Sequence, residues 1–284
     1  MSTVGIVTDT TNCLPAELIA EYGIRVASVV LVIEGKSYRD QVDITPTQFW
    51  KMFKGLEEMP TTSAVSPGDF VDYFKELGKT TDNIACIVVS QPLSGTYDSA
   101  LKAKELVQAE RPDLNIEVIN SKTATGALGF IVLEAARAAK AGKSLAEVVE
   151  LVNSLIPRVK YLVALDTLKY LIKGGRAPKV AMIGDLLQVK PILTNNNETG
   201  MVEPASRARG KRKTMLKLVD MVQNYTDTTK PLHVMVHYTD NQEDGEQLKE
   251  LLTSKYDCAE LYMTEYTPVI AAHTGPVLAL SFYS

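Results

Sequence analysis

Hydroxyl side chains gather in a short segment that directly follows an apolar run. The run spans residues 83–90, and the next ten residues place hydroxyls beside Pro92 and Gly95, at Ser94, Thr96 and Ser99. Such a run is typical of a strand buried on both faces, and the Pro and Gly end it before a helical pattern begins. Backbone N–H groups at the start of a helix, together with hydroxyls, can bind an anion. Because residues 91–100 include no Lys or Arg, the segment favours a carboxylate over a polyphosphate.

Two further segments, 60–68 and 272–276, share this character. The first contains Thr62 and Ser63, and the second contains His273 and Thr274, each segment with Gly or Pro close by. Brought together with residues 90–99, they would form a pocket of neutral donors with one imidazole. The alternative is that these residues only build turns and helix caps, as Ser66 before Pro67 is expected to do.

A catalytic interpretation is also open. Ser94 could serve as a nucleophile and His273 as its base, in an acyl hydrolase or a stand-alone phosphotransferase. The residues around Ser94 do not match a G-x-S-x-G elbow, and no orienting carboxylate is evident. His233 and His237 are expected on one face of a strand, but zinc would need a third ligand. The catalytic interpretation is therefore the weaker one and stays open, and neither a metal nor a cofactor is expected.

Basic residues occur in two places that could contact a partner. Lys173 and Arg176 flank two glycines after a short helical run, which is typical of a helix end and offers two cations to a phosphate. The run 207–213, which includes Arg209, is the densest basic segment. Basic residues are disfavoured in the first turn of a helix, so this run is either a solvated helix start or a partner surface.

Composition restricts the class of protein. The chain has 284 residues, of which 45% are hydrophobic and 23% charged, and its formal net charge is −4. These values fit a globular protein and argue against nucleic acid as the main partner. The three cysteines form no C-x-x-C pair, which favours a reducing, cytoplasmic location. No apolar stretch is long enough to predict a membrane span.

Strand and helix patterns predict an α/β fold with two parts. Residues 1–165 alternate apolar runs, among them 4–7, 24–33, 83–90, 115–120 and 161–165, with helices that start at Thr45, Ser66 and Ser144. This alternation predicts a mostly parallel three-layer domain whose ligand site lies at the carboxyl ends of the strands. Residues 166–284 show a hairpin around 192–202 and read as an α+β domain with a more antiparallel sheet.

Several short motifs follow one another in a fixed order. They are Val-Thr-Asp-Thr-Thr at the start, Asp-Gln-Val-Asp-Ile at 40–44, Thr-Ser at 62–63, Ser-Pro-Gly-Asp-Phe at 66–70, Leu-Ser-Gly-Thr-Tyr at 93–97, Leu-Ile-Lys-Gly-Gly-Arg at 171–176, Arg-Gly at 209–210 and Pro-Val-Ile-Ala-Ala-His-Thr-Gly at 268–275. Over essentially the whole chain, this set resembles the DegV family of bacterial fatty-acid-binding proteins, the FakB-type subunits of fatty acid kinase.

The resemblance implies that the two domains enclose a long-chain fatty acid. It places the carboxylate near Thr62, Ser94 and His273, with Ser63, Gly95, Thr96 and Thr274 in the same loops. It also implies that a separate ATP-binding kinase subunit phosphorylates the carboxylate for phospholipid synthesis, so that this protein is a lipid carrier and not itself an enzyme. Arg209, with Lys173 and Arg176, is then expected to contact that partner, and lipid exchange implies transient membrane contact.

The sequence departs from the family pattern at the head-group loops. Ala64-Val65 follow Thr62-Ser63 where the family has Gln-Pro, and Asp98 replaces a Gln after Tyr97. Binding energy is expected to come from the tail. An acid of about C14–C18 offers on the order of 10 kcal/mol of gross burial, at ~0.8 kcal/mol per methylene. The head group then needs hydrogen bonds that replace its lost hydration.

Overall fold

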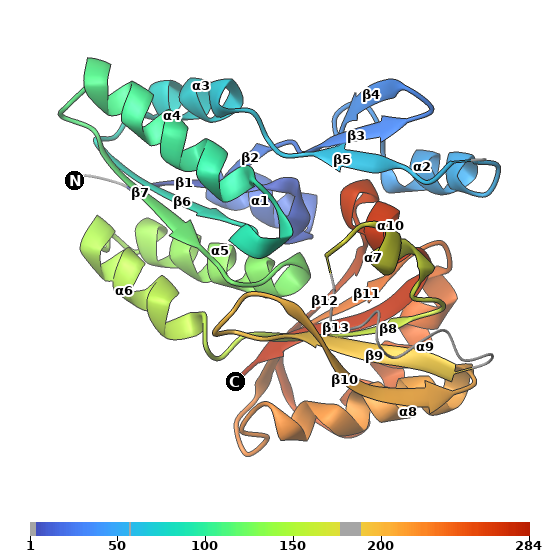
Figure 1. Cartoon of the computed structure of the whole chain (residues 1–284). Helices are drawn as coiled ribbons and strands as arrows, with labels where there is room; N and C mark the ends of the chain where they lie inside the picture. The colour runs from blue at the N-terminus through green and yellow to red at the C-terminus, as the bar shows by residue number, and fades with distance from the viewer. Residues whose placement is uncertain (1–3, 57, 177–188) are drawn as a thin grey trace.

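A parallel sheet forms the first layer of the structure. The computed structural model describes residues 4–56, 58–176 and 189–284. The strand order is β2-β1-β6-β7, with β1 Val4–Asp9, β2 Arg25–Ala27, β6 Asn83–Val88 and β7 Asn115–Asn120. One face is covered by α3 Pro67–Leu77 and α4 Thr96–Glu110, and the other by α1 Ala16–Tyr22, α5 Thr125–Lys140 and α6 Leu145–Leu155 (Figure 1). The predicted three-layer arrangement is confirmed.

Three predicted helix starts are confirmed by their caps. Thr45 forms a capping box with Gln48 at the start of α2 Pro46–Phe53, and Ser144 forms one with Glu147 at the start of α6. Ser66 accepts a hydrogen bond from the backbone N–H of Asp69 at the start of α3. These caps satisfy N–H groups that the first helical turn leaves unpaired, so short local patterns suffice to place the helices.

A small antiparallel sheet, β4-β3-β5, lies beside the parallel one. It comprises β3 Val30–Ile33, β4 Lys36–Arg39 and β5 Thr61–Ser63. The prediction of one strand over 24–33 is therefore wrong, because β2 and β3 belong to different sheets. The chain changes sheet where the backbone N–H of Val29 donates to the hydroxyl of Thr10 instead of to a neighbouring strand.

A six-stranded mixed sheet forms the other half, in the order β10-β9-β8-β13-β11-β12. Its strands are β8 Lys160–Leu165, β9 Val189–Asn195, β10 Val202–Arg209, β11 Leu232–Tyr238, β12 Cys258–Glu265 and β13 Val277–Tyr283. Most of its strand pairs are antiparallel, as expected, and β9 and β10 form the predicted hairpin.

The predicted division after residue 165 does not follow the sheets. β8 pairs with β13 and β9, so the chain passes to the second sheet between α6 and β8. Because β8 is apolar on both faces, its pattern is the same for a central strand of either sheet. The sequence could therefore predict the strand but not its partners.

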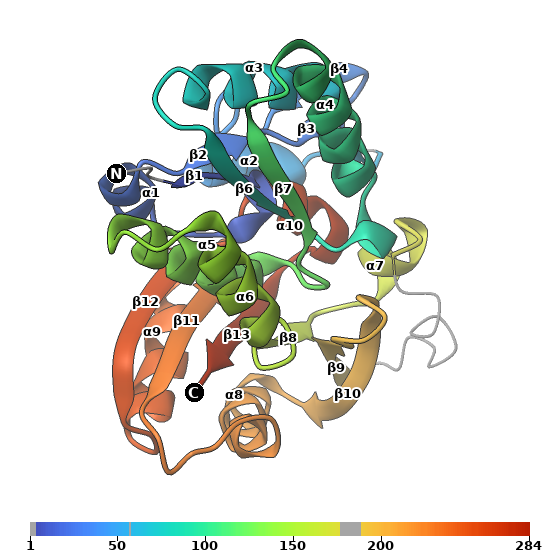
Figure 2. The same ribbon diagram turned by 90° about the vertical axis from the view of Figure 1, so that its left-hand side faces the viewer.

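Helix α5 lies between the two large sheets (Figures 1 and 2). Almost all of its residues are buried, and its apolar side chains share one cluster with β1 and β6 on one side and with β8 and β13 on the other. A helix that is apolar all round is typical of such a central position. On the outer face of the six-stranded sheet lie α8 Lys211–Met221 and α9 Gln242–Thr253.

Two short helices complete the part that positions the site. α7 Lys169–Lys173 follows β8, and α10 Pro268–Thr274 connects β12 to β13. Both lie between the six-stranded sheet and the small sheet (Figure 1). Within the described ranges, no helix combines the length and hydrophobicity that crossing a bilayer would require.

Candidate functional site

A cavity lies between the carboxyl ends of the parallel sheet and the inner face of the six-stranded sheet. The space open to the centre of a water-sized sphere is about 140 Å³. Side chains from both halves line it: Thr11, Val29, Thr62, Ala64, Val89, Leu93, Ser94, Gly95, Ala124 and Thr125 from the first, and Tyr161, Val163, Leu165, Leu171, Arg176, Leu193, Val202, Tyr266, Val269, Ile270, His273 and Thr274 from the second. The cavity thus lies at the carboxyl ends of the parallel strands, where the sequence predicts a ligand site.

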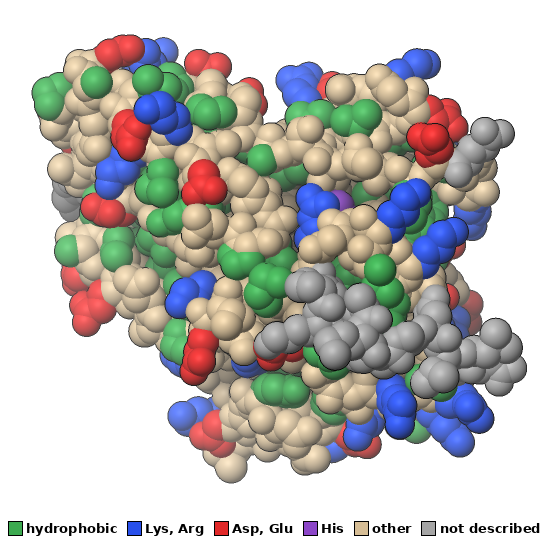
Figure 3. Space-filling view, in the orientation of Figure 1, with side chains coloured by type: hydrophobic (Ala, Val, Ile, Leu, Met, Phe, Trp, Pro, Cys, Tyr) green, Lys and Arg blue, Asp and Glu red, His purple; other side chains and the backbone are tan. Residues whose placement is uncertain are grey.

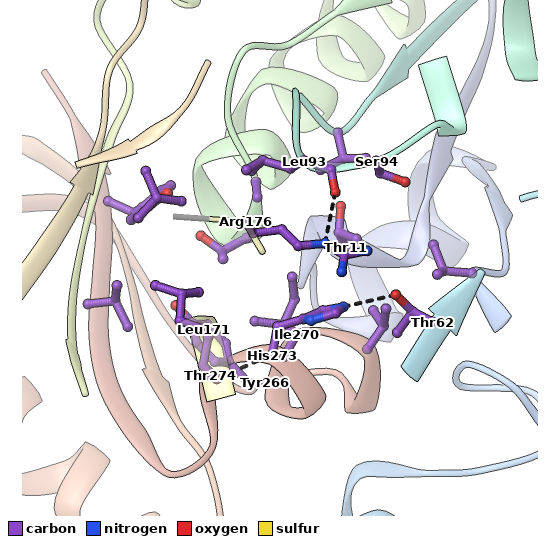
Figure 4. Close-up of a pocket in the computed structure, with 18 of the residues that line it drawn as sticks. Thr11, Thr62, Leu93, Ser94, Leu171, Arg176, Tyr266, Ile270, His273 and Thr274 are labelled. Atoms are coloured by element: carbon purple, nitrogen blue, oxygen red, sulfur yellow. Dashed lines mark hydrogen bonds between the residues drawn. The ribbon is translucent and has the colours of Figure 1, made fainter. Parts of the chain in front are cut away.

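The polar end of the cavity is formed by Thr62, Ser94, Arg176 and His273 (Figure 4). Thr62 lies on β5 and His273 at the last turn of α10, and a hydrogen bond of 2.9 Å joins Thr62 Oγ1 to His273 Nε2. Side chains alternate along a strand, so Ser63 lies on the other face of β5, where it is exposed. The structure therefore brings Thr62 and His273 together and leaves Ser63 outside.

Ser94 is held by its neighbour Thr96. Their hydroxyls lie 2.9 Å apart, and the backbone N–H of Thr96 donates to Ser94 Oγ at 3.3 Å. Thr96 is fully buried and begins α4, a few residues earlier than the helical pattern predicts. Ser94 and Gly95 line the cavity, whereas Thr96 lies behind them and orients the Ser94 hydroxyl.

The sequence-based prediction for the position of Arg176 is wrong. This residue was expected on a partner surface, but its guanidinium lines the cavity and its Nε donates to the carbonyl of Leu93 at 3.4 Å. Gly174, directly after α7, allows this segment to pack closely against His273, because a Cβ there would lie only 2.9 Å from His273 Nδ1. Gly175 then turns the chain back with a φ of +70°. The two glycines were the signal that could have placed Arg176.

Charge at the polar end resides on Arg176. Burial, with the nearby guanidinium, lowers the pKa of His273 to about 4, so the imidazole is neutral at pH 7. Burial also lowers the pKa of Arg176, although a guanidinium stays charged at neutral pH. Among the described residues that line the cavity, Arg176 is thus the one fixed charge. The prediction of a pocket with neutral donors alone is wrong.

The apolar end is formed by one face of three neighbouring strands. Val163 and Leu165 come from β8, Leu193 from β9 and Val202 from β10. All four are buried and belong to the apolar cluster that also contains α5. The cavity is therefore amphipathic, with hydrogen-bonding groups and a cation at one end and aliphatic side chains at the other.

Other residues singled out in the sequence lie outside this arrangement. The hydroxyl of Thr274 faces the cavity wall but already donates to the carbonyls of Ile270 and Gly275. Asp98, the departure from the family pattern, is exposed and accepts a hydrogen bond of 2.9 Å from Gln91 Nε2. Asp98 does not line the cavity, and the helix dipole favours its carboxylate in the first turn of α4.

The predicted partner-binding cations divide into two groups. Lys173 and Arg209 are exposed, unlike Arg176. Figure 3 shows Lys and Arg side chains gathered over β10 and α8. The exposed basic residues there are Arg207, Arg209, Lys211, Arg212, Lys213 and Lys217. The basic run is therefore a surface feature. Of the three predicted partner-binding cations, Arg176 is the one that lines the cavity.

Ser94 and His273 do not form a nucleophile and base pair. Each hydrogen bonds to a threonine, Ser94 to Thr96 and His273 to Thr62. No carboxylate is found among the described lining residues. The arrangement suits binding of an anion better than activation of a serine, for which a hydrogen bond between serine and histidine is needed.

Both histidines on β11 form hydrogen bonds through their side chains. His237 contacts Thr264 and Ser281, and His233 Nδ1 lies 2.6 Å from Glu260. Glu134, His233 and Glu260 are close enough to hold a metal ion. However, the guanidinium of Arg137 contacts both carboxylates at 2.6 Å and supplies the positive charge that a metal would. We interpret this cluster as an ion-pair network.

Comparisons with known proteins agree with the architecture. The family model described as "uncharacterised protein, DegV family" matches residues 3–284. A DegV domain-containing protein of Caldanaerobacter subterraneus is 36% identical over 284 residues, which cover 100% of this chain and 99% of that protein. The chain therefore belongs to the DegV family, and the resemblance noted in the sequence is confirmed.

Solved structures are similar over the whole length. A DegV family protein of Thermus thermophilus, described as binding fatty acid, has a TM-score of 0.89 and 32% identity, with 99% of each chain covered. A stearic acid-binding protein of Eubacterium ventriosum has a TM-score of 0.88 and 25% identity, with 100% of this chain and 98% of that chain covered. The predicted fold class is thereby confirmed.

Proposed function

We propose that this protein binds one long-chain fatty acid in the cavity. The observation that carries the proposal is the amphipathic lining, in which Arg176, Ser94, Thr62 and His273 face a mainly apolar space. A fatty acid has the same division into one anion and one hydrocarbon chain. The relatives of known structure described above, which bind fatty acids, support the same ligand class.

The two ends would contribute differently to affinity. Each buried methylene adds ~0.8 kcal/mol, so the chain supplies most of the favourable free energy. A buried carboxylate is costly unless it is hydrogen-bonded or paired. Arg176 can pair with the carboxylate, and the hydroxyls of Ser94 and Thr62 can donate to it. The neutral imidazole of His273 has one N–H, and when Nε2 donates it to Thr62 Oγ1, the hydroxyl hydrogen of Thr62 is free for the carboxylate.

The finer role is presentation of the carboxylate to a kinase. In this proposal a separate ATP-binding subunit forms the acyl phosphate for phospholipid synthesis, and the protein described here is the carrier. Lys173, three positions before Arg176, and the exposed Arg209 offer cations on the outer surface for that partner. The carrier would act in the cytoplasm and contact membranes briefly to exchange lipid.

Ligand identity can be tested directly. Protein produced in bacteria is expected to carry long-chain fatty acid, which solvent extraction and mass spectrometry would detect. Delipidated protein should take up added hexadecanoate or octadecanoate in isothermal titration. Protein that is repeatedly empty and fails to bind either acid would overturn the proposal.

The kinase role needs a separate test with an ATP-binding partner subunit. Arg209→Ala is expected to leave fatty-acid binding unchanged and to slow acyl phosphate formation. Arg111→Ala, which removes a partly exposed arginine at the C-terminal end of α4, is the matched control. Loss of fatty-acid binding in Arg209→Ala, or an equal slowing in both variants, would contradict the assignment of Arg209 to the partner surface.

A further inference from the structure

Two tyrosines interrupt the aliphatic wall of the cavity. Tyr161 lies on β8, and Tyr266 lies between β12 and α10, where Figure 4 labels it. Their exposed fractions are 4% and 0%. Neighbouring positions on β8 that line the cavity are Val163 and Leu165. Phenol hydroxyls in such surroundings require a partner, because the hydrocarbon side chains offer none.

Neither phenol hydroxyl forms a hydrogen bond of ordinary length and angle with a described residue. The hydroxyl of Tyr266 is buried, and its polar neighbour, the hydroxyl of Thr125, interacts with it without such a bond. Tyr161 forms hydrogen bonds through its backbone N–H and carbonyl, to Asn195 and Thr194, but none through its hydroxyl. Burying a hydroxyl without a hydrogen-bond partner is unfavourable. Phenylalanine would fill the same space without that cost.

A third hydroxyl, that of Thr125, is fixed beside Tyr266 by a buried chain of hydrogen bonds. Thr125 Oγ1 lies 3.2 Å from Ser281 Oγ, which lies 3.0 Å from His237 Nε2. His237 Nδ1 in turn lies 2.6 Å from Thr264 Oγ1. Burial lowers the pKa of His237 to about 3, so the ring is neutral and donates at one nitrogen while it accepts at the other. The end of this chain that lines the cavity is the hydroxyl of Thr125.

We propose that Tyr161, Tyr266 and Thr125 form a second polar subsite, which binds an oxygen atom carried partway along the acyl chain. The ligand class is a long-chain hydroxy fatty acid. The inference rests on the proposed function, because the carboxylate must first be held at the polar end. The chain hydroxyl then accepts a hydrogen bond from one phenol and can donate to another. The subsite thereby offsets the cost of burying a hydroxyl in hydrocarbon.

Titration with a positional series tests this subsite. Delipidated wild-type protein, Tyr266→Phe and Tyr161→Phe would each be titrated with octadecanoate and with monohydroxyoctadecanoates whose hydroxyl moves along the chain. In the wild type, isomers with the hydroxyl over one interval of the chain should bind more tightly than the other isomers. The Phe variants should lower the affinity for those isomers relative to the affinity for octadecanoate by roughly three- to tenfold, as expected for one lost hydrogen bond.

Controls separate this subsite from the proposed function. Tyr256→Phe removes a phenol hydroxyl that bonds the carbonyl of Val219, away from the cavity, and should change no affinity. A uniform penalty for every hydroxylated isomer, equal in wild type and Phe variants, would overturn the subsite while octadecanoate still bound. That pattern is expected if a buried water, and not the ligand, forms the hydrogen bonds to the phenol hydroxyls. Failure of octadecanoate itself would instead refute the proposed function.

Discussion

The two ends of the cavity are built in different ways. At the polar end, four segments each contribute one side chain: Thr62 from β5, Ser94 from the turn before α4, Arg176 from the turn after α7 and His273 from α10. At the apolar end, β8, β9 and β10 contribute from one continuous sheet face. The polar end therefore depends on the relative placement of distant segments. The apolar end depends only on the alternation of side chains along strands.

This difference predicts where substitutions act. A change at the polar end should alter the affinity by the same factor for acids of every length, because it acts on the carboxylate. A change at the apolar end should act through the number of methylenes that fit. The two responses can be separated by titrating each variant with acids of increasing length.

The largest effect is expected from Arg176→Met, which keeps an unbranched side chain and removes the guanidinium and its charge. Hydrogen bonds to charged groups contribute about 1.5–3 kcal/mol, so affinity should fall roughly 10- to 100-fold for every acid. Isothermal titration measures this loss. Lys173→Met, an exposed lysine on α7, is the matched control. Equal affinities for Arg176→Met and wild type would remove Arg176 from the carboxylate site.

A smaller and length-dependent effect is expected from Val202→Phe. The larger ring would displace about two methylenes of the bound chain, which corresponds to ~1.5 kcal/mol or roughly tenfold in affinity for the longest acids. Shorter acids should be affected less, so the preferred length should decrease. Val42→Phe, at an exposed position, controls for the added ring. A uniform loss at all lengths would indicate general disruption of the fold.

Ser94→Ala should weaken binding by severalfold, since one neutral hydrogen bond contributes about 1 kcal/mol. His273→Ala is expected to act in the same direction, because it removes the imidazole that contacts Thr62. Ser63→Ala, at the exposed position beside Thr62, is the control and should leave the affinity unchanged. Wild-type affinity in both Ser94→Ala and His273→Ala would contradict the assignment of this end to the carboxylate.

Asp40→Asn is expected to change the affinity least. It should instead change how the free energy of unfolding depends on pH. Asp40 is fully buried, and burial raises its pKa to about 8, although Thr10, Thr267 and the N–H of Val269 on α10 oppose the shift. The folded state thus holds a proton that the unfolded chain releases near pH 4. The stabilisation is full below pH 4 and decreases as pH rises towards 8.

Asn cannot titrate, so its free energy of unfolding should lack this decrease. Relative to wild type, Asp40→Asn should gain stability between pH 5 and pH 8, by on the order of 1 kcal/mol or more. Urea unfolding at both pH values measures the difference. Asp43→Asn, an exposed carboxylate paired with Arg39, provides the comparison. A pH-independent difference between wild type and Asp40→Asn would show that Asp40 is ionised throughout.

The sequence predicted local features better than long-range ones. Thr45, Ser66 and Ser144 cap helices as expected, because capping involves residues three positions apart. The partners of β8 and the position of Arg176 depend on contacts across the whole chain, which periodicity does not encode. Thr62, Ser94 and His273 are grouped into one candidate site by the hydroxyl-rich character that their segments share and by the family resemblance, not by spacing. Ser63 was included because the alternation along the short strand β5 was not recognised.

The central position of α5 has a consequence for how the molecule folds. Both large sheets use this one helix to cover an inner face, so neither half has a complete core of its own. A fragment ending before β8 would expose the face of α5 that the second sheet covers, and a fragment beginning at β8 would lack the helix altogether. Unfolding should therefore be a single cooperative transition, in which the two ends of the cavity form and disappear together.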